Sequence, residues 1–180
     1  MNLLKAVENC HSRAGVEVIV KWVGHSPSRF GQLTKLLLKG TRNVQIRASW
    51  PLSYCCERFP ELAGPHLKQL VRHLRNPDVH GSVRRSVVRS MQFLDIPKSL
   101  QGEVADLCFG YLANPSEEPA IRIFSMSVLL NLVEVVPDLA GELKLIIEDQ
   151  LPYASPGFRS RAKKVLKQLN TIKRPMDRKP

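Results

Sequence analysis

A leucine and an arginine ten residues apart recur along this chain of 180 residues. The four pairs are Leu37–Arg47, Leu74–Arg84, Leu112–Arg122 and Leu151–Arg161. Successive arginines lie 37, 38 and 39 residues apart, and each opens a stretch with apolar residues at helical spacing. Such a period is the signature of a repeat architecture, in which each unit buries its apolar face against the next.

Each period is predicted to hold two helices joined by a short turn. In each unit, the helix that follows the one opened by the arginine begins near a proline, at Pro60, Pro97 and Pro137, where a helical N–H would lack a partner anyway. Asn-Pro, Ser-Pro and Gly separate the helices. The predicted helices cover residues 2–10, 13–23, 28–39, 45–58, 61–75, 82–95, 98–112, 119–136, 138–150 and 157–171.

The predicted fold is all-α, a right-handed α–α superhelix of about five helix pairs. We expect one domain over residues 1–172 and a basic C-terminal tail over 173–180. A hydrophobic content of 43 % with only 6 % aromatics suits packed helices. The apolar residues after the repeat arginines match between units and are expected in the core: Val87, Val88 and Met91 in one, Met126, Leu129 and Leu130 in the next.

The four cysteines are Cys10, Cys55, Cys56 and Cys108. No C-x-x-C occurs and a vicinal pair is poor disulfide geometry, so reduced thiols in a cytoplasmic protein are expected. No signal-peptide pattern opens the chain, and its longest early apolar run, VEVIVKWV, is too short to cross a membrane. We expect no membrane partner.

No catalytic constellation, metal site or cofactor site is predicted. His66 and His73 stand seven apart without partners at zinc-ligand spacing. Cys55 and Cys56 have no histidine matched nearby and are interpreted as buried, inert thiols. The acidic pairs Glu117-Glu118 and Glu148-Asp149 are interpreted as solvated.

Charge is segmented along the chain, which has a net charge of +11. Residues 1–94 carry +10, residues 95–149 carry −7 and residues 150–180 carry +8. The second helices of a right-handed solenoid line its concave surface, where basic residues would track a phosphate backbone; a generic solvated face is the alternative. The candidate macromolecule-binding residues there are Arg42, Trp50, Arg85, Arg89, Arg159 and Lys163.

The four repeat arginines have a structural interpretation instead. Arg47, Arg84, Arg122 and Arg161 are predicted to tie each turn to the neighbouring repeat. In the stretch NVQIRASWPLSYCC, Arg47, Trp50 and Tyr54 share one helical face. Pro51 is expected to remove one helical hydrogen bond and bend the helix there.

The Leu-x9-Arg pairs, the IRAS and RSRAKK helix starts and the period of 37–39 residues resemble HEAT repeats over about residues 28–170. The segments IRASWPLSY, AIRIFSMSVLLNL and GELKLIIEDQL are similar to a family of short bacterial HEAT-like proteins. Glu142-Leu143-Lys144 and Arg161-Ala162 match that family, and Pro51 departs from it. Members are sometimes labelled adenylosuccinate lyase, but the Ser-Ser-x-Met-Pro-x-Lys-x-Asn-Pro loop of that lyase family is absent here.

The expected function is that of a non-catalytic scaffold or adaptor, a monomer or weak dimer, whose concave face binds another protein or an acidic surface. The alternative is nucleic-acid binding, by an analogy at fold level with HEAT-like DNA alkylation repair proteins. An enzyme acting on adenylosuccinate is the least favoured of the three.

Overall fold

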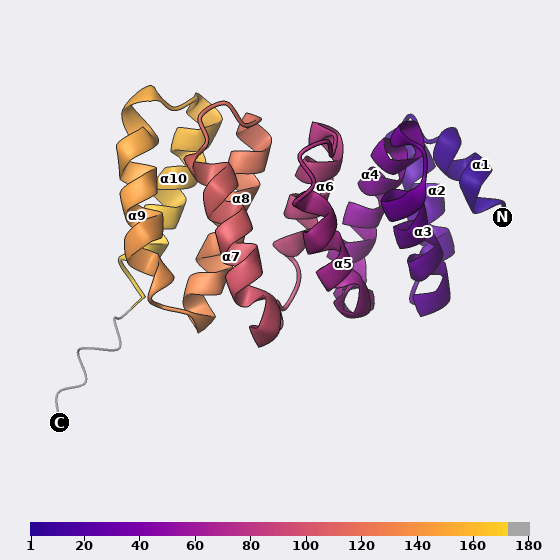
Figure 1. The fold of residues 1–180 in the computed structure, drawn as a ribbon, viewed down its shortest axis with the longest axis horizontal. Coiled ribbons are helices and arrows are strands. Elements are labelled where there is room, and N and C mark those ends of the chain that lie inside the picture. Colours follow the sequence, from indigo (N-terminus) through magenta and orange to yellow (C-terminus); the bar gives the residue numbers. More distant parts are fainter. Residues whose placement is uncertain (173–180) are drawn as a thin grey trace. The chain divides into compact units, whose positions relative to one another are not determined.

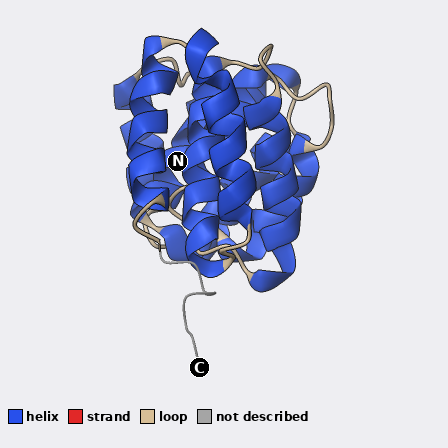
Figure 2. Ribbon diagram, turned by 90° about the vertical axis from the view of Figure 1, so that its left-hand side faces the viewer, coloured by secondary structure: helices blue, strands red, loops and turns tan. Residues whose placement is uncertain are grey.

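The computed structural model describes residues 1–172, and within them every regular element is helical (Figure 2). The predicted basic tail, residues 173–180, lies outside the described residues. The helices are α1 (Leu3–Glu8), α2 (Arg13–Val23), α3 (Pro27–Lys39), α4 (Arg42–Arg58), α5 (Gly64–Leu74), α6 (Gly81–Met91), α7 (Lys98–Ala113), α8 (Pro119–Val135), α9 (Leu139–Gln150) and α10 (Pro156–Leu169). All ten predicted helices are present, and none in the described part is both long and apolar enough to span a bilayer.

The chain forms two compact units, Met1–Asp95 and a second that begins at Ile96. In the first unit, α4 packs against α3 within its own pair and against α2 and α6 of the neighbouring pairs (Figure 1). The second unit repeats this arrangement, with α8 packed on α7 and on α10. The second helices of successive pairs therefore form a layer within each unit. The fold is an all-α solenoid, and its right-handed sense stays a prediction.

The repeat-matched apolar residues fill the core, as predicted. Val87, Val88 and Met91 of α6 are buried, and so are Met126, Leu129 and Leu130 of α8. Each unit buries whole helical stripes, because residues three and four apart return to the same side of a helix. Most of the buried hydrophobic residues are leucines and valines.

Side-chain caps and short turns set the helix boundaries. Ser12, Ser26 and Ser155 each accept a hydrogen bond from a backbone N–H in the first turn of the following helix. Gly40 connects α3 to α4, and an added Cβ there would lie 2.5 Å from the carbonyl oxygen of Leu36. This close approach requires glycine and lets α4 begin at Arg42, three residues before the predicted start.

Two other boundaries differ from the prediction because short turns take up the ends of the predicted helices. Residues Pro60–Leu62 form a 3₁₀ turn, so α5 begins only at Gly64. Helix α6 ends at Met91, after which the N–H groups of residues 92–94 bond to carbonyls three residues earlier. Pro97 and Pro137 precede their helices rather than opening them.

Helix α4 continues through Pro51, which is buried. Proline has no N–H, so the carbonyl of Arg47 lacks its usual helical donor. The helix nevertheless runs from Arg42 to Arg58 without a break. Its buried neighbours Leu52, Cys55 and Cys56 hold the segment by packing.

Candidate interaction surface

The outer stripe of α4 carries the aromatic residues that the sequence placed on one face. Arg47, Trp50, Tyr54 and Glu57 follow at steps of three, four and three residues, and so lie along one side of the helix. The Trp50 side chain is 37 % exposed and Tyr54 is half-buried. Since α4 lies between α2 and α6, its stripe forms the middle of the layer of second helices in the first unit.

Two guanidinium groups from the flanking helices contact the ring of Tyr54. Arg13 of α2 lies 4.1 Å from the ring centroid, and Arg89 of α6 lies 4.7 Å from it. Arg89 also lies 5.1 Å from the ring centroid of Phe93. These distances are those of cation–π contacts, which are attractive because the face of an aromatic ring is electron-rich. We call Arg13, Trp50, Tyr54, Arg89 and Phe93 the arginine–aromatic surface.

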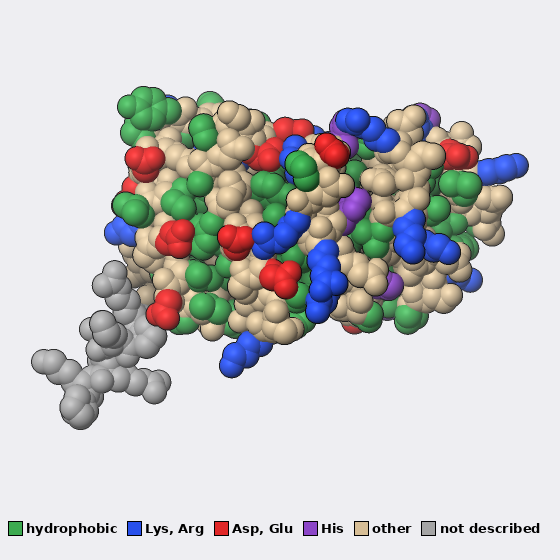
Figure 3. All heavy atoms as spheres, in the orientation of Figure 1, with side chains coloured by type: hydrophobic (Ala, Val, Ile, Leu, Met, Phe, Trp, Pro, Cys, Tyr) green, Lys and Arg blue, Asp and Glu red, His purple; other side chains and the backbone are tan. Residues whose placement is uncertain are grey.

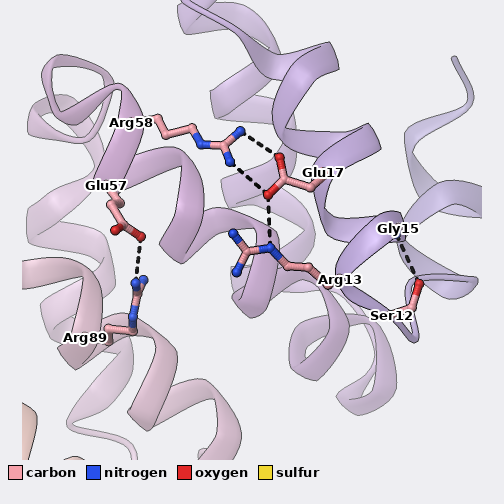
Figure 4. Close-up of polar contacts among 7 residues, drawn as sticks. All are labelled: Ser12, Arg13, Gly15, Glu17, Glu57, Arg58 and Arg89. Atoms are coloured by element: carbon pink, nitrogen blue, oxygen red, sulfur yellow. Dashed lines mark hydrogen bonds and ion pairs between the residues drawn. The ribbon is translucent and has the colours of Figure 1, made fainter.

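Carboxylates fix these arginines in place (Figure 4). Arg13 donates from Nε to Glu17 at 3.0 Å, and both terminal nitrogens of Arg58 contact the same carboxylate, at 2.7 and 2.8 Å. The hydrogen bond from Arg58, followed by that from Arg13, lowers the pKa of Glu17. Glu17 therefore stays ionised and links α2 to α4.

Arg89 is held by a second set of acceptors. It donates from Nη2 to Glu57 at 2.6 Å and from Nη1 to the hydroxyl oxygen of Ser53 at 2.9 Å. Both acceptors belong to α4, and Ser53 lies 36 residues before Arg89, close to one repeat period. Sequence reasoning had placed Arg89 on a phosphate-binding face, whereas in the structure its guanidinium is engaged within the protein.

The other predicted binding residues are divided between the two units. Arg42 is the exposed first residue of α4 and Arg85 is exposed on α6. Arg159 and Lys163 belong to α10 of the second unit, where both are exposed and Arg159 donates to the carbonyl of Pro152 at 3.1 Å. The binding role of these residues stays a prediction.

The repeat arginines lie near the turns, partly buried. Arg47 donates to the carbonyl of Glu8, the last residue of α1, and contacts the ring nitrogens of His11 in the turn before α2. Arg122 donates from Nε to the carbonyl of Leu112 at 3.4 Å, contacts the side-chain oxygen of Gln150, and lies 4.8 Å from the ring centroid of Phe158. Arg84 and Arg161 are half-buried on α6 and α10. The structural role of the four stays a prediction.

Burial shifts the pKa values of the four cysteines and of two partly buried histidines. All four cysteines are free and buried, and burial raises the pKa of Cys55, Cys56 and Cys108 to about 12. Such thiols are poor nucleophiles because almost none is ionised near neutral pH. Burial lowers the pKa of His66 and of His73. Within residues 1–172, no three His, Cys, Asp or Glu side chains gather in an arrangement able to hold a metal ion.

The sequence did not point to two residues of the arginine–aromatic surface, Arg13 and Phe93, or to the residues that pair with its arginines, Glu17, Glu57 and Arg58. One signal was readable, since Arg13 and Glu17 are four apart and their ion pair follows from helical geometry. The remaining contacts join different helices, so only the fold brings them together.

A family model described as a HEAT repeat domain matches residues 3–169. No curated protein and no solved structure matches the chain. The match covers all ten helices, from the start of α1 to the end of α10.

Proposed function

Because the chain belongs to the HEAT repeat domain family, we propose that it is a non-catalytic scaffold that binds a protein partner through the arginine–aromatic surface of its first unit. Stacked helix pairs offer extended surfaces, which repeat proteins use for binding. The observation that carries the proposal is the contact of Tyr54 with two guanidinium groups, beside a tryptophan that is 37 % exposed.

The composition of this surface favours a protein partner. Aromatic residues and arginine are enriched where protein interfaces are tightest, because they combine a large contact area with directional hydrogen bonding. Trp50 and Phe93 are both exposed, while Arg13 and Arg89 are held by Glu17 and Glu57. Side chains that are already fixed lose little rotamer entropy when a partner binds.

The charge balance of the same surface disfavours a phosphate backbone as the main ligand. Arg13 and Arg58 share Glu17, and Arg89 pairs with Glu57 at 2.6 Å. A phosphate would have to compete with these carboxylates and would be repelled by them. Binding along a phosphate backbone requires several neighbouring cationic side chains that are not already paired with carboxylates.

Site-specific photocrosslinking tests the proposal. A photoreactive amino acid is placed at Trp50 of the full-length chain, expressed in its native cells and irradiated, and the crosslinked species is identified by mass spectrometry. The matched control carries the same group at Tyr153, which is 92 % exposed in the second unit. We expect one defined protein adduct at position 50 and none at position 153.

The identified partner is then purified and titrated with wild-type protein and with Trp50→Ala. A hot-spot tryptophan is worth about 2 kcal/mol or more, so the affinity should fall by about thirtyfold or more. Equal labelling at both positions, or an unchanged affinity of Trp50→Ala for the partner, would contradict the proposal. A nucleic-acid adduct at position 50 would favour the alternative function.

A further inference from the structure

A second surface of the first unit is an apolar groove between α1 and α3. Helix α1 is only six residues long, against thirteen for α3. The groove encloses about 340 Å³ and is lined by Leu3, Leu4, Gln32, Lys35, Leu36, Lys39 and Gly40. The side chain of Leu4 is 44 % exposed. An exposed apolar hollow of this kind gains free energy when another apolar group fills it.

The polar residues around the groove restrict its occupant. Lys35 and Lys39 are four residues apart and both exposed, so they stand on the same side of α3. No Asp or Glu is among the residues that line the groove. The fitting occupant therefore has an apolar side chain with carboxylates next to it.

Helix α9 in the second unit has this combination on its outer side. Leu143 and Ile147 are buried, whereas Leu145, midway between them, is 69 % exposed. A step of two residues turns a helix by about 200°, so Leu145 points away from the core. Glu142 lies three residues before it, and Glu148 and Asp149 lie three and four residues after it.

The carboxylates of α9 exceed its positive charge. Lys144 is the one basic residue of the helix, and its ammonium lies 3.8 Å from Glu148. Over α9, acidic side chains are interspersed with hydrophobic ones (Figure 3). The exposed leucine of α9 is complementary to the leucines of the groove, and its carboxylates are opposite in charge to the lysines of the groove.

We propose that α9 of one copy docks into the α1–α3 groove of a second copy, with Leu145 in the groove and carboxylates facing Lys35 and Lys39. The two surfaces are different, so the contact is heterologous, and each molecule carries one donor helix and one acceptor groove. One apolar anchor with exposed ion pairs makes a weak interface, which strengthens with protein concentration and weakens with salt.

Charge reversal on either side tests this contact by sedimentation velocity. The groove variant is Lys35→Glu with Lys39→Glu, and the helix variant is Glu142→Lys with Asp149→Lys. Wild-type protein is compared from about 10 μM to about 1 mM, the range in which weak interfaces fill. We expect the wild-type sedimentation coefficient to rise with concentration, and each variant alone to stay monomeric because its groove and helix now repel.

Mixing the two variants is the decisive measurement. The acidic groove of the groove variant then meets the basic α9 of the helix variant. The unchanged α9 of the groove variant also meets the unchanged groove of the helix variant, as in the wild type, so association should return. Lys164→Glu with Lys167→Glu is the matched control, because these exposed lysines of α10 lie outside the groove and the variant changes the net charge as much as the groove variant does. It should associate like wild type, and so should Trp50→Ala.

Three outcomes would overturn the proposal. They are a wild-type protein that sediments as a monomer at every concentration, a mixture that stays monomeric, and a control variant that also loses association. Far-UV circular dichroism of each variant verifies that the helices are intact. Crosslinking of a different acidic protein at Leu4, with no crosslink to a second copy, would show that the groove has another occupant.

Discussion

Arg122 donates a hydrogen bond from Nε to the backbone carbonyl of Leu112, the residue with which it is paired in the sequence repeat. The carbonyl lies in the last turn of α7, where the helix itself supplies no donor. With a spacing of ten residues, an arginine near the start of α8 reaches a carbonyl at the end of α7, the preceding helix. For this pair, the repeat in the sequence is also a contact in space.

We predict that Arg122→Ala destabilises the protein by about 1–3 kcal/mol, because it leaves the partly buried carbonyl of Leu112 without this donor. The aromatic contact with Phe158 is lost as well. Urea unfolding followed by circular dichroism measures the change. Lys164→Ala, an exposed residue of α10, should stay within about 0.5 kcal/mol of wild type. If both variants unfold at the same urea concentration, Arg122 has no structural role.

Acid should weaken the link between α2 and α4. The pKa of Glu17 is lowered by hydrogen bonds from Arg58 and Arg13, so its contribution to stability is present above the unfolded pKa of about 4.5. It is lost as the pH falls through the lower, folded pKa. Between neutral and acidic pH, the melting temperature of the wild type should fall more steeply than that of Glu17→Gln. Glu134→Gln, at an exposed position of α8, should follow the wild-type curve.

The thiols should react only when the protein opens. Burial raises the pKa of Cys55, Cys56 and Cys108 to about 12, and also raises that of Cys10. A disulfide reagent at about pH 8 should therefore modify the native protein slowly and all four thiols at once in denaturant. Rapid reaction of the native protein at any one cysteine would show that its helix opens locally.

Nucleic-acid binding should be non-specific and sensitive to salt. Because the protein has a net charge of +11, we expect it to retain duplex DNA at about 50 mM salt and to release it well below 200 mM. Arg42→Glu with Arg85→Glu should weaken this retention, since both residues are exposed. Trp50→Ala should leave it unchanged. Retention near physiological salt that disappears in Trp50→Ala would instead make nucleic acid the partner of the arginine–aromatic surface.

The fold was readable from the sequence because it depends on periodicity. The spacing of Arg47, Arg84 and Arg122 fixed the phase of the repeat, and the apolar positions after them fixed the buried faces. Boundaries were harder where turn chemistry competes with helix formation. Gly40 allowed α4 to start early, and a 3₁₀ turn at Pro60 delayed α5.

The candidate surface was less predictable for a geometric reason. The sequence indicates which side of a helix a residue occupies, and on that basis Trp50 and Tyr54 were correctly placed together. It does not indicate which side chain of the next helix lies opposite. Arg89 was therefore assigned to phosphate binding, although Ser53 and Glu57 of α4 stand within hydrogen-bonding distance of it.

The bond between Ser53 and Arg89 joins α4 to α6 across the segment that contains α5. Residues 75–78, between α5 and α6, are all exposed, whereas α4 and α6 pack directly on each other. A single cut in that turn would leave the noncovalent interface intact. We therefore expect two fragments divided at this turn to reassociate, and a reporter domain inserted there to leave the packing of α4 on α6 undisturbed.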